Sequence, residues 1–303
     1  MLKKLAINIL LVGCTVFVLD LAIGKILRHY YFTETSGLHY RTTYSMEKTR
    51  ADILIFGSSR ANHHYVPEIF EDSLKMSFYN TGRDGNGIFY QVALLHAVLA
   101  RYTPKLIVLD YAGSFEKGQN EYDKISSLLP YYRTHPELRK VIEMKGPYEK
   151  YKLGSEIYPF NSQVLTIAMG NMERNKHRNP DNKGYVELHT ERAIEKERFT
   201  DSIIKPMDSS KINALREFVA LAKKSGARLV VIYSPLYQDL AIYPEVDICR
   251  DICRQEQVEF FDYSRDPFFL KRGDLYFDPV HLNHEGALIF SRLIVSRLKN
   301  KVE

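Results

Sequence analysis

The sequence predicts an α/β protein, a three-layer α/β/α sandwich around a parallel sheet, with one long and mostly helical insertion. Short apolar runs that end at Gly or polar residues alternate with amphipathic stretches, which is the rhythm of strands and helices in such a sheet. The chain has 303 residues, of which 45% are hydrophobic and 26% charged, enough for one large core. From about residue 114 to about residue 206 the alternation of strands and helices stops, and this break predicts the insertion.

The first 28 residues predict a membrane anchor. From Leu5 to Leu27 the chain is apolar apart from Asn8, Asp20 and Lys25, and about twenty such residues can cross a bilayer as a helix. The basic residues that precede this run favour a cytoplasmic N-terminus. We therefore expect a single-pass anchor over 1–28 in a bacterial inner (cytoplasmic) membrane, with the rest of the chain outside the cytoplasm.

Two other interpretations of this segment stay open. A cleaved signal peptide would end at a small-x-small site, and none follows the apolar run. The motif Leu11-Val12-Gly13-Cys14 is similar to a lipobox, but the stretch after Cys14 stays apolar, whereas a lipidated Cys normally opens a polar tether.

Residues 29–50 are polar with scattered aromatics and predict a linker, so that a chain starting near Tyr44 should keep its fold. The domain is expected over 51–303. Pro67 suits the first turn of a helix, and continuous apolar runs are typical of strands buried on both faces. The first half of the domain is expected to hold strands at 52–56, 77–80 and 105–111, and helices at 67–74 and 88–102.

The insertion at about 114–206 is polar and aromatic, punctuated by Pro, and has no strand-helix alternation. Excursions of this length often form lids or substrate surfaces in α/β enzymes, and a solvated spacer is the alternative. The sheet then resumes, with strands at 228–233 and 258–262 and helices at 209–224, 244–255 and 284–298. Asp208 and Gly226 suit the two ends of the first of these helices.

Two motifs at opposite ends of the domain carry the groups of a nucleophilic site. Gly57-Ser58-Ser59-Arg60 follows the first strand, and Asp278-Pro279-Val280-His281-Leu282-Asn283 precedes the last helix. A Ser hydroxyl attacks an ester only when a base takes its proton, and an imidazole base needs a partner that fixes its tautomer. We therefore predict Ser59 as nucleophile, His281 as base and Asp278 as the carboxylate that orients it.

These motifs, with Asn80-Thr81-Gly82-Arg83-Asp84-Gly85, resemble the SGNH/GDSL hydrolase superfamily over residues of about 51–113 and 207–298. The resemblance implies a flavodoxin-like three-layer sandwich and an oxyanion hole formed by the Ser59 and Gly85 amides. The family's third-block Asn is absent here, and Ser114 is the nearest match. Since one oxyanion donor lowers the barrier by about 3 kcal/mol, either Ser114 substitutes, another group such as Asn62 or Asn86 reaches in, or catalysis is weak.

The anchor, the Gly-Ser-Ser block and the missing Asn are similar to the envelope branch of this superfamily, which includes proteins of the D-alanyl-transfer and alginate-acetylation type. This implies an esterase or acyltransferase acting on acyl, most readily acetyl, esters of an envelope polysaccharide or other acylated glycan, with an integral-membrane acyl-transfer protein as a partner. No metal or organic cofactor is implied. The net charge of +5 has no clustered basic run, so we expect no nucleic-acid surface.

Three residues beside Ser59 are candidates for substrate binding: Arg60, Asn62 and His64. Arg60 can clamp an anionic substrate or form a salt bridge to Asp84 or Glu68, and the sequence favours neither. His63 and His64 can bind substrate, although an exposed polar pair at a helix start is the simpler interpretation. A rival for the whole chain is a non-catalytic envelope component that uses the same fold to bind polymer or a membrane partner.

Overall fold

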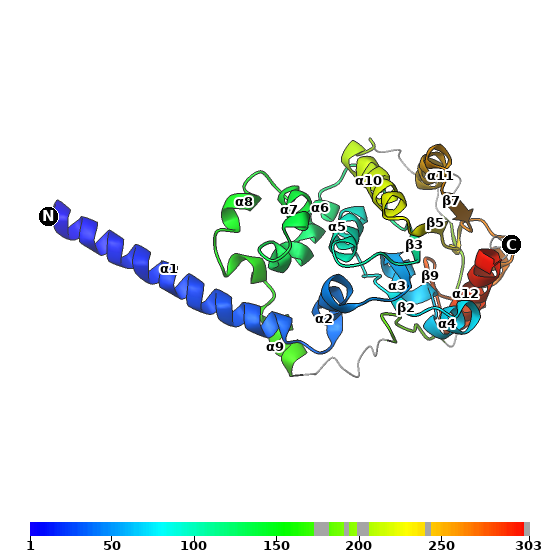
Figure 1. Ribbon diagram of the computed structural model, residues 1–303, viewed down its shortest axis with the longest axis horizontal. Helices are drawn as coiled ribbons and strands as arrows, with labels where there is room; N and C mark the ends of the chain where they lie inside the picture. Colours follow the sequence, from blue (N-terminus) through cyan, green and yellow to red (C-terminus); the bar gives the residue numbers. More distant parts are fainter. Residues whose placement is uncertain (173–181, 191–193, 199–205, 240–243, 300–303) are drawn as a thin grey trace.

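The computed structural model describes residues 1–172, 182–190, 194–198, 206–239 and 244–299. A long helix, α1 (Leu2–Phe32), projects from an α/β domain, and the C-terminus lies at the far end of that domain (Figure 1). The predicted fold class is confirmed, because a parallel sheet lies between two layers of helices.

Five parallel strands form the central sheet in the order β2-β1-β3-β5-β7. Their bounds are β1 (Ile53–Gly57), β2 (Phe78–Asn80), β3 (Leu106–Asp110), β5 (Arg228–Tyr233) and β7 (Glu259–Asp262). The chain moves from β1 to one side for β2 and to the other side for β3, so the carboxyl ends of β1 and β3 border the crevice at which such sheets bind ligands. Gly57 pairs with Asp110 at this end.

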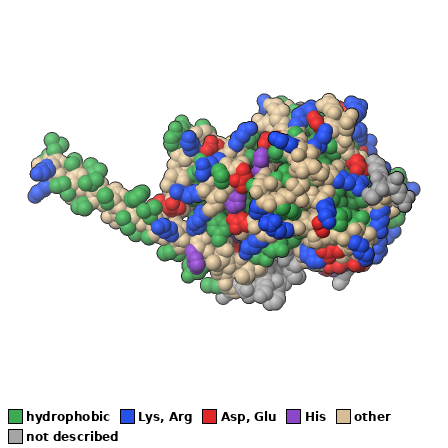
Figure 2. Space-filling model, viewed as in Figure 1, with side chains coloured by type: hydrophobic (Ala, Val, Ile, Leu, Met, Phe, Trp, Pro, Cys, Tyr) green, Lys and Arg blue, Asp and Glu red, His purple; other side chains and the backbone are tan. Residues whose placement is uncertain are grey.

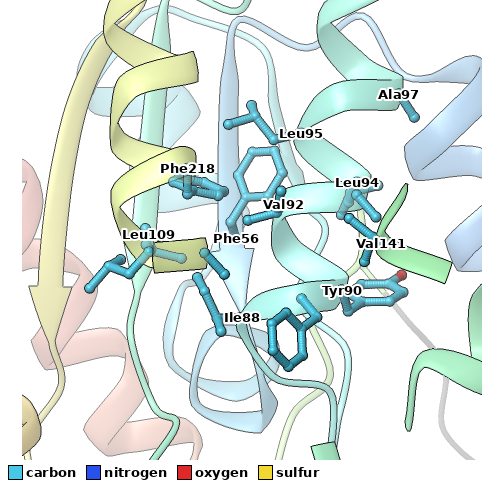
Figure 3. Packing of buried hydrophobic residues seen from close by; sticks show 14 of the residues in the cluster. Phe56, Ile88, Tyr90, Val92, Leu94, Leu95, Ala97, Leu109, Val141 and Phe218 are labelled. Atoms are coloured by element: carbon cyan, nitrogen blue, oxygen red, sulfur yellow. The ribbon is translucent and has the colours of Figure 1, made fainter. Parts of the chain in front are cut away.

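Alternate strand residues face opposite helical layers. Ile53 and Ile55 belong to a core that includes residues of α4 (Pro67–Leu74) and α12 (His284–Lys299), whereas Leu54 and Phe56 belong to a core with α5 (Ile88–Leu99) and α10 (Ser209–Ser225). The second core is drawn in Figure 3, where Phe56 and Leu109 of the sheet lie among Ile88, Val92 and Leu95 of α5 and Phe218 of α10.

The helix ends follow the predicted signals. Asp208 accepts a hydrogen bond from the Ser210 amide at 2.9 Å and caps α10, and Gly226 ends this helix with a φ of 83°, a conformation that favours Gly. Near the C-terminus the remaining regular elements are α11 (Pro244–Glu256), the short helices η5 (Phe269–Lys271) and η6 (Gly273–Leu275), and the hairpin β8 (Tyr276–Asp278) and β9 (His281–Leu282).

Residues 29–50 are not an open linker, which corrects the sequence-based expectation. They contain the end of α1, then α2 (Gly37–Thr43) and a π-helical turn, η1 (Tyr44–Lys48). Thr43 is buried and its Oγ1 lies 2.7 Å from the Tyr131 hydroxyl, and Arg41 donates to the Gly82 carbonyl at 3.1 Å. The segment is polar because its polar groups bond to the domain, not because it is solvated.

The described part of the predicted insertion folds as short helices. They are α6 (Asn120–Lys124), η2 (Ile125–Tyr131), η3 (Pro136–Leu138), α7 (Arg139–Glu143), α8 (Glu149–Lys152), η4 (Tyr158–Phe160) and α9 (Val164–Asn171). Further along, β4 (Glu197–Arg198) pairs in parallel with β6 (Gln238–Asp239). Residues 173–181, 191–193 and 199–205 of the expected insertion lie outside the described residues.

The insertion holds the second half of α1. Asp20 accepts hydrogen bonds from the Ser155 hydroxyl at 2.5 Å and the Glu156 amide at 2.8 Å. Gly24 packs so closely against Glu156 that a Cβ on Gly24 would come within 2.2 Å of the Glu156 Cβ. Tyr31 is 1% exposed. By contrast, every residue from Met1 to Leu19 is exposed, and α1 is the one helix of the described chain long and apolar enough to cross a membrane.

Candidate active site

Ser59 lies at a sharp turn between β1 and α3 (Ser59–His64), at the carboxyl edge of the sheet. Gly57 makes this turn with a φ of 148°, and a Cβ there would lie 2.4 Å from the Asp110 carbonyl oxygen. The side chain of Gln91 on α5 satisfies both backbone groups of Gly57, accepting from its amide at 3.1 Å and donating to its carbonyl at 2.9 Å. Ser59 is therefore presented by a rigid turn that only Gly at position 57 permits.

The structure brings Ser59, His281 and Asp278 together. His281 Nδ1 lies 2.7 Å from Asp278 Oδ2, and His281 Nε2 lies 2.6 Å from Ser59 Oγ. Because a carboxylate only accepts, a neutral His281 carries its proton on Nδ1, so its Nε2 accepts the Ser59 hydroxyl proton. This is the orientation in which an imidazole activates a Ser hydroxyl.

The β8–β9 turn fixes the carboxylate. Asp278 Oδ1 accepts from the amides of Val280 and His281, both at 2.9 Å, which leaves Oδ2 for the imidazole. Burial by itself would raise the pKa of Asp278, but the hydrogen bonds from His281 and the Val280 amide outweigh it, and this pKa lies below its usual value. The carboxylate therefore stays ionised at neutral pH.

A cleft of about 370 Å³ opens beside the nucleophile turn and is lined by Ser58, Gly85, Asn86 and Ser114 among others. Gly85 is exposed, with a φ of 73° and no atom within 4 Å of where a Cβ would be. Ser114 Oγ accepts from the Glu116 amide at 3.1 Å, and its own O–H remains able to donate. The two expected oxyanion donors beyond Ser59 thus line one cleft.

The far wall of the cleft is charged. It contains Lys117, Lys124, Lys211 and Glu121. Lys211 is 3% exposed and donates to the Glu116 carbonyl at 2.7 Å, while its Nζ lies 4.0 Å from Glu121 Oε1. Burial raises the pKa of Glu121, against the opposing effect of Lys211. Among the described residues, no three His, Cys, Asp or Glu side chains gather as a metal site would require.

Arg60 lies inside the protein, which corrects both interpretations of it. It is 4% exposed, donates to the Tyr111 carbonyl at 2.7 Å, and stacks over the Tyr233 ring at 4.3 Å. It pairs with neither Asp84 nor Glu68 in the structure. Groups that follow or end β3 and β5, the Tyr111 carbonyl and the Tyr233 ring, hold the guanidinium inside the protein, and Arg60 does not line the cleft.

Asn62 and His63 are also buried, at 2% and 6% exposure, so the expected exposed His pair is wrong. Asn62 donates to Asp84 Oδ1 at 2.7 Å, His63 donates from Nδ1 to the Val186 carbonyl at 2.7 Å, and His63 Nε2 lies 3.3 Å from Asp84 Oδ2. The Asn62 amide is thus already engaged. These residues hold the loop that leads to Gly85.

His64 is fully buried, and the structure leaves it no surface for substrate. Its Nε2 accepts from the Leu282 amide at 2.9 Å, so it joins α3, which carries Ser59, to β9, which carries His281. Sequence reasoning missed this role, as it missed Gln91. The sequence feature that could have indicated the role of His64 is its position on the helical turn that follows the nucleophile. No local pattern marks Gln91.

No family model matches the chain, and no curated protein matches it. Two solved structures are similar to it over most of their length. One is a Bacteroides fragilis protein described as a candidate acylhydrolase, with 12% identity and a TM-score of 0.44, covering 89% of this chain and all of that one. The other is a Streptococcus pneumoniae protein described as a candidate platelet activating factor, with 13% identity and a TM-score of 0.40, covering 97% and 99%. At these scores the likeness adds nothing to what the site itself supports.

Proposed function

We propose that the protein is a membrane-anchored serine esterase or O-acyltransferase of the SGNH type, acting outside the cytoplasm on acyl esters of cell-envelope glycans. One observation carries the catalytic part of this proposal. Ser59 and His281, 222 positions apart, lie in hydrogen-bond contact at 2.6 Å with Asp278 behind the imidazole. A buried structural Ser would have no need of a base that a carboxylate orients.

In the proposed reaction, Ser59 Oγ attacks the ester carbonyl while His281 Nε2 takes its proton. The Ser59 and Gly85 amides, with the Ser114 hydroxyl, stabilise the oxyanion. His281 then returns the proton to the leaving alcohol, and Asp278 stabilises the imidazolium in between. Water releases the acid in hydrolysis, or a sugar hydroxyl accepts the acyl group in transfer.

The glycan part of the proposal is supported by the cleft and by α1. The cleft beside Ser59 offers the exposed side chains of Lys117 and Asn120, which are groups that hydrogen-bond to sugar hydroxyls. An apolar helix of the length of α1 suits an inner-membrane anchor, and it would keep the domain near envelope polymers and near an integral-membrane partner that supplies or receives the acyl group.

A fluorophosphonate probe tests the nucleophile, since only an activated Ser reacts with it. We expect the wild type and Ser58→Ala to be labelled, and Ser59→Ala and His281→Ala to lose both labelling and ester hydrolysis. Triad members act as a unit, so the last two variants should be equally impaired. Ser58 is the matched control, because it lies one position earlier on the same turn. Labelling of Ser59→Ala would refute the assignment.

One observation favours a second function. Ser114 stands where the resemblance places an Asn donor, and its Oγ already accepts from the Glu116 amide. A weak oxyanion hole would suit an SGNH-like protein that binds polymer without cleaving it. Such a protein would bind acetylated glycan yet leave the probe unreacted, so the same labelling experiment separates the two functions.

A further inference from the structure

The charge pattern of α1 sets how far the domain can stand from a membrane. Its uncharged stretch, Leu5 to Leu19, is about 22 Å long as an α-helix, whereas the hydrocarbon core of a bilayer is about 30 Å thick. If α1 spans the membrane, as the proposed function has it, the hydrocarbon must reach at least to Asp20. Asp20 is also the first residue of α1 that is not exposed, and the insertion hydrogen-bonds to it.

The insertion therefore meets α1 at the level of the lipid headgroups. Asp20 accepts from the Ser155 hydroxyl and from the amides of Glu156 and Ile157, which satisfies a carboxylate that lipid would otherwise leave unpaired. Gly24 closes the contact, because its missing side chain lets the Glu156 backbone touch the helix. The domain is held on α1 with no spacer between them.

A corner of the insertion lies beside this contact. It consists of residues 147–152, which include α8 and lead directly into the segment that binds Asp20. Figure 1 shows α8 on the side of the domain that faces the free end of α1. Tyr148 and Tyr151 are 68% and 77% exposed there. Lys150, which lies between them in the sequence, and Lys152, which follows them, are also exposed.

The composition of this corner matches a lipid headgroup layer. Tyr is enriched where membranes meet water, because its ring is apolar and its hydroxyl is polar, and exposed Lys side chains are attracted to anionic lipids. The acidic residue of the corner, Glu149, is 1% exposed, with its carboxylate 3.4 Å from Lys152 and 3.7 Å from Lys145. The exposed groups of α8 are thus aromatic or basic. Figure 2 shows hydrophobic and basic side chains, with some acidic ones beside them, on the part of the domain nearest α1.

We propose that the 147–152 corner inserts into the headgroup layer of the membrane that α1 spans, so that the domain is docked on the bilayer at two places. The insertion is then a membrane-docking element, in addition to providing the cleft wall near Ser114. Docking at two places fixes the tilt of the domain relative to the bilayer, and with it the direction in which the Ser59 cleft opens.

The chain contains no Trp, so a single introduced Trp reports its own environment. We expect full-length Tyr151→Trp and Tyr148→Trp, reconstituted in vesicles with brominated acyl chains, to be quenched roughly twofold and blue-shifted, as Trp in the membrane interface is. Phe268→Trp is the matched control. Phe268 is 48% exposed and precedes Phe269, which packs against Phe290 of α12. Figure 1 shows α12 at the end of the molecule away from α1, so the Trp at position 268 should be neither quenched nor shifted.

Equal responses at Tyr151 and Phe268, or no quenching at Tyr151, would overturn the proposal. A blue shift without quenching would also overturn it, because a protein partner would then cover the corner. Retention of the protein by the vesicles in alkaline carbonate tests separately whether α1 spans the membrane. Fluorophosphonate labelling in the same vesicles tests whether Ser59 is an activated nucleophile. A result that excludes insertion of the 147–152 corner can therefore be distinguished from one that excludes the membrane anchor or the esterase activity of the proposed function.

Discussion

His64 shows how one buried side chain can serve a site without touching substrate. It accepts from the Leu282 amide while standing on the same short helix as Ser59. Burial lowers the pKa of His64 well below its usual value, and the nearby His281 and Arg60 lower it further. The ring therefore stays neutral at neutral pH and remains an acceptor, which keeps Ser59 and His281 at a constant separation.

We predict that His64→Leu lowers kcat by about tenfold to 100-fold with little change in KM, because small displacements of catalytic groups have effects of this size. His64→Gln retains an acceptor for the Leu282 amide and should recover most of the loss. Steady-state kinetics on a chromogenic ester and the rate of fluorophosphonate labelling measure both variants. If the His64→Gln and His64→Leu variants have equally lowered kcat while they melt at the same temperature, the positioning role of His64 is wrong.

Ser114 is the proposed side-chain donor of the oxyanion hole. We expect Ser114→Ala to lower kcat by roughly tenfold or more with KM little changed, since an oxyanion donor acts mainly in the transition state. Ser114→Asn restores the donor that the resemblance implies and should exceed Ser114→Ala in kcat. A Ser114→Ala variant with wild-type kinetics would show that the third donor lies elsewhere.

The candidate triad was predictable because its pattern is local: a Ser after a strand, and a carboxylate three residues before a His. The burial of Arg60 and His64 was not predictable, because it depends on which other segments cover the sheet edge. Arg60 is enclosed by Tyr233 and Tyr111, and His64 by β9. These partners come from parts of the chain more than forty residues away, so no pattern near Ser59 records them.

At the scale of elements, apolar periodicity located the sheet and its covering helices, and the observed bounds differ from the expected ones by a few residues at most. It failed over 29–50, where polar residues gave no periodicity. There the helix is held by tertiary hydrogen bonds such as Arg41 to Gly82 and Thr43 to Tyr131. A polar segment looks like a linker in the sequence whenever its hydrogen-bond partners lie far along the chain.

A truncation series tests this correction. A chain that begins at Tyr44 loses α2 and with it the contacts of Thr42 to Tyr90 and of Thr43 to Tyr131. We expect it to unfold roughly 5–10 °C below a chain that begins at Asp20, because the buried partners left behind cost several kcal/mol. Circular dichroism melts in one buffer compare the two. Equal melting temperatures would restore the linker interpretation.

At the scale of the whole molecule, α1 packs against the domain with one half and, in the proposed function, spans the membrane with the other. Its exposed half, up to Leu19, is apolar, and its second half carries Asp20, Gly24 and Tyr31 into the insertion. Cleavage after the apolar run would remove Asp20 and Gly24, which hold α1 on the insertion. The packing thus favours a retained anchor over a cleaved signal peptide, and it accounts for an acidic residue near the end of a membrane helix.

We therefore expect the full-length protein in the membrane fraction, resistant to alkaline carbonate, with Met1 or Leu2 as its first residue by intact mass. A mass that begins at Cys14 and carries a diacylglyceryl group would instead show a lipoprotein. Orientation follows from Lys3 and Lys4, which favour a cytoplasmic N-terminus. Alkaline phosphatase fused after Glu303 should be active, and a cytoplasmic reporter at the same position should be silent. The reverse pattern would place Ser59 and its cleft in the cytosol, where envelope glycans are absent, and the proposed substrate class would then fail even if the esterase chemistry held.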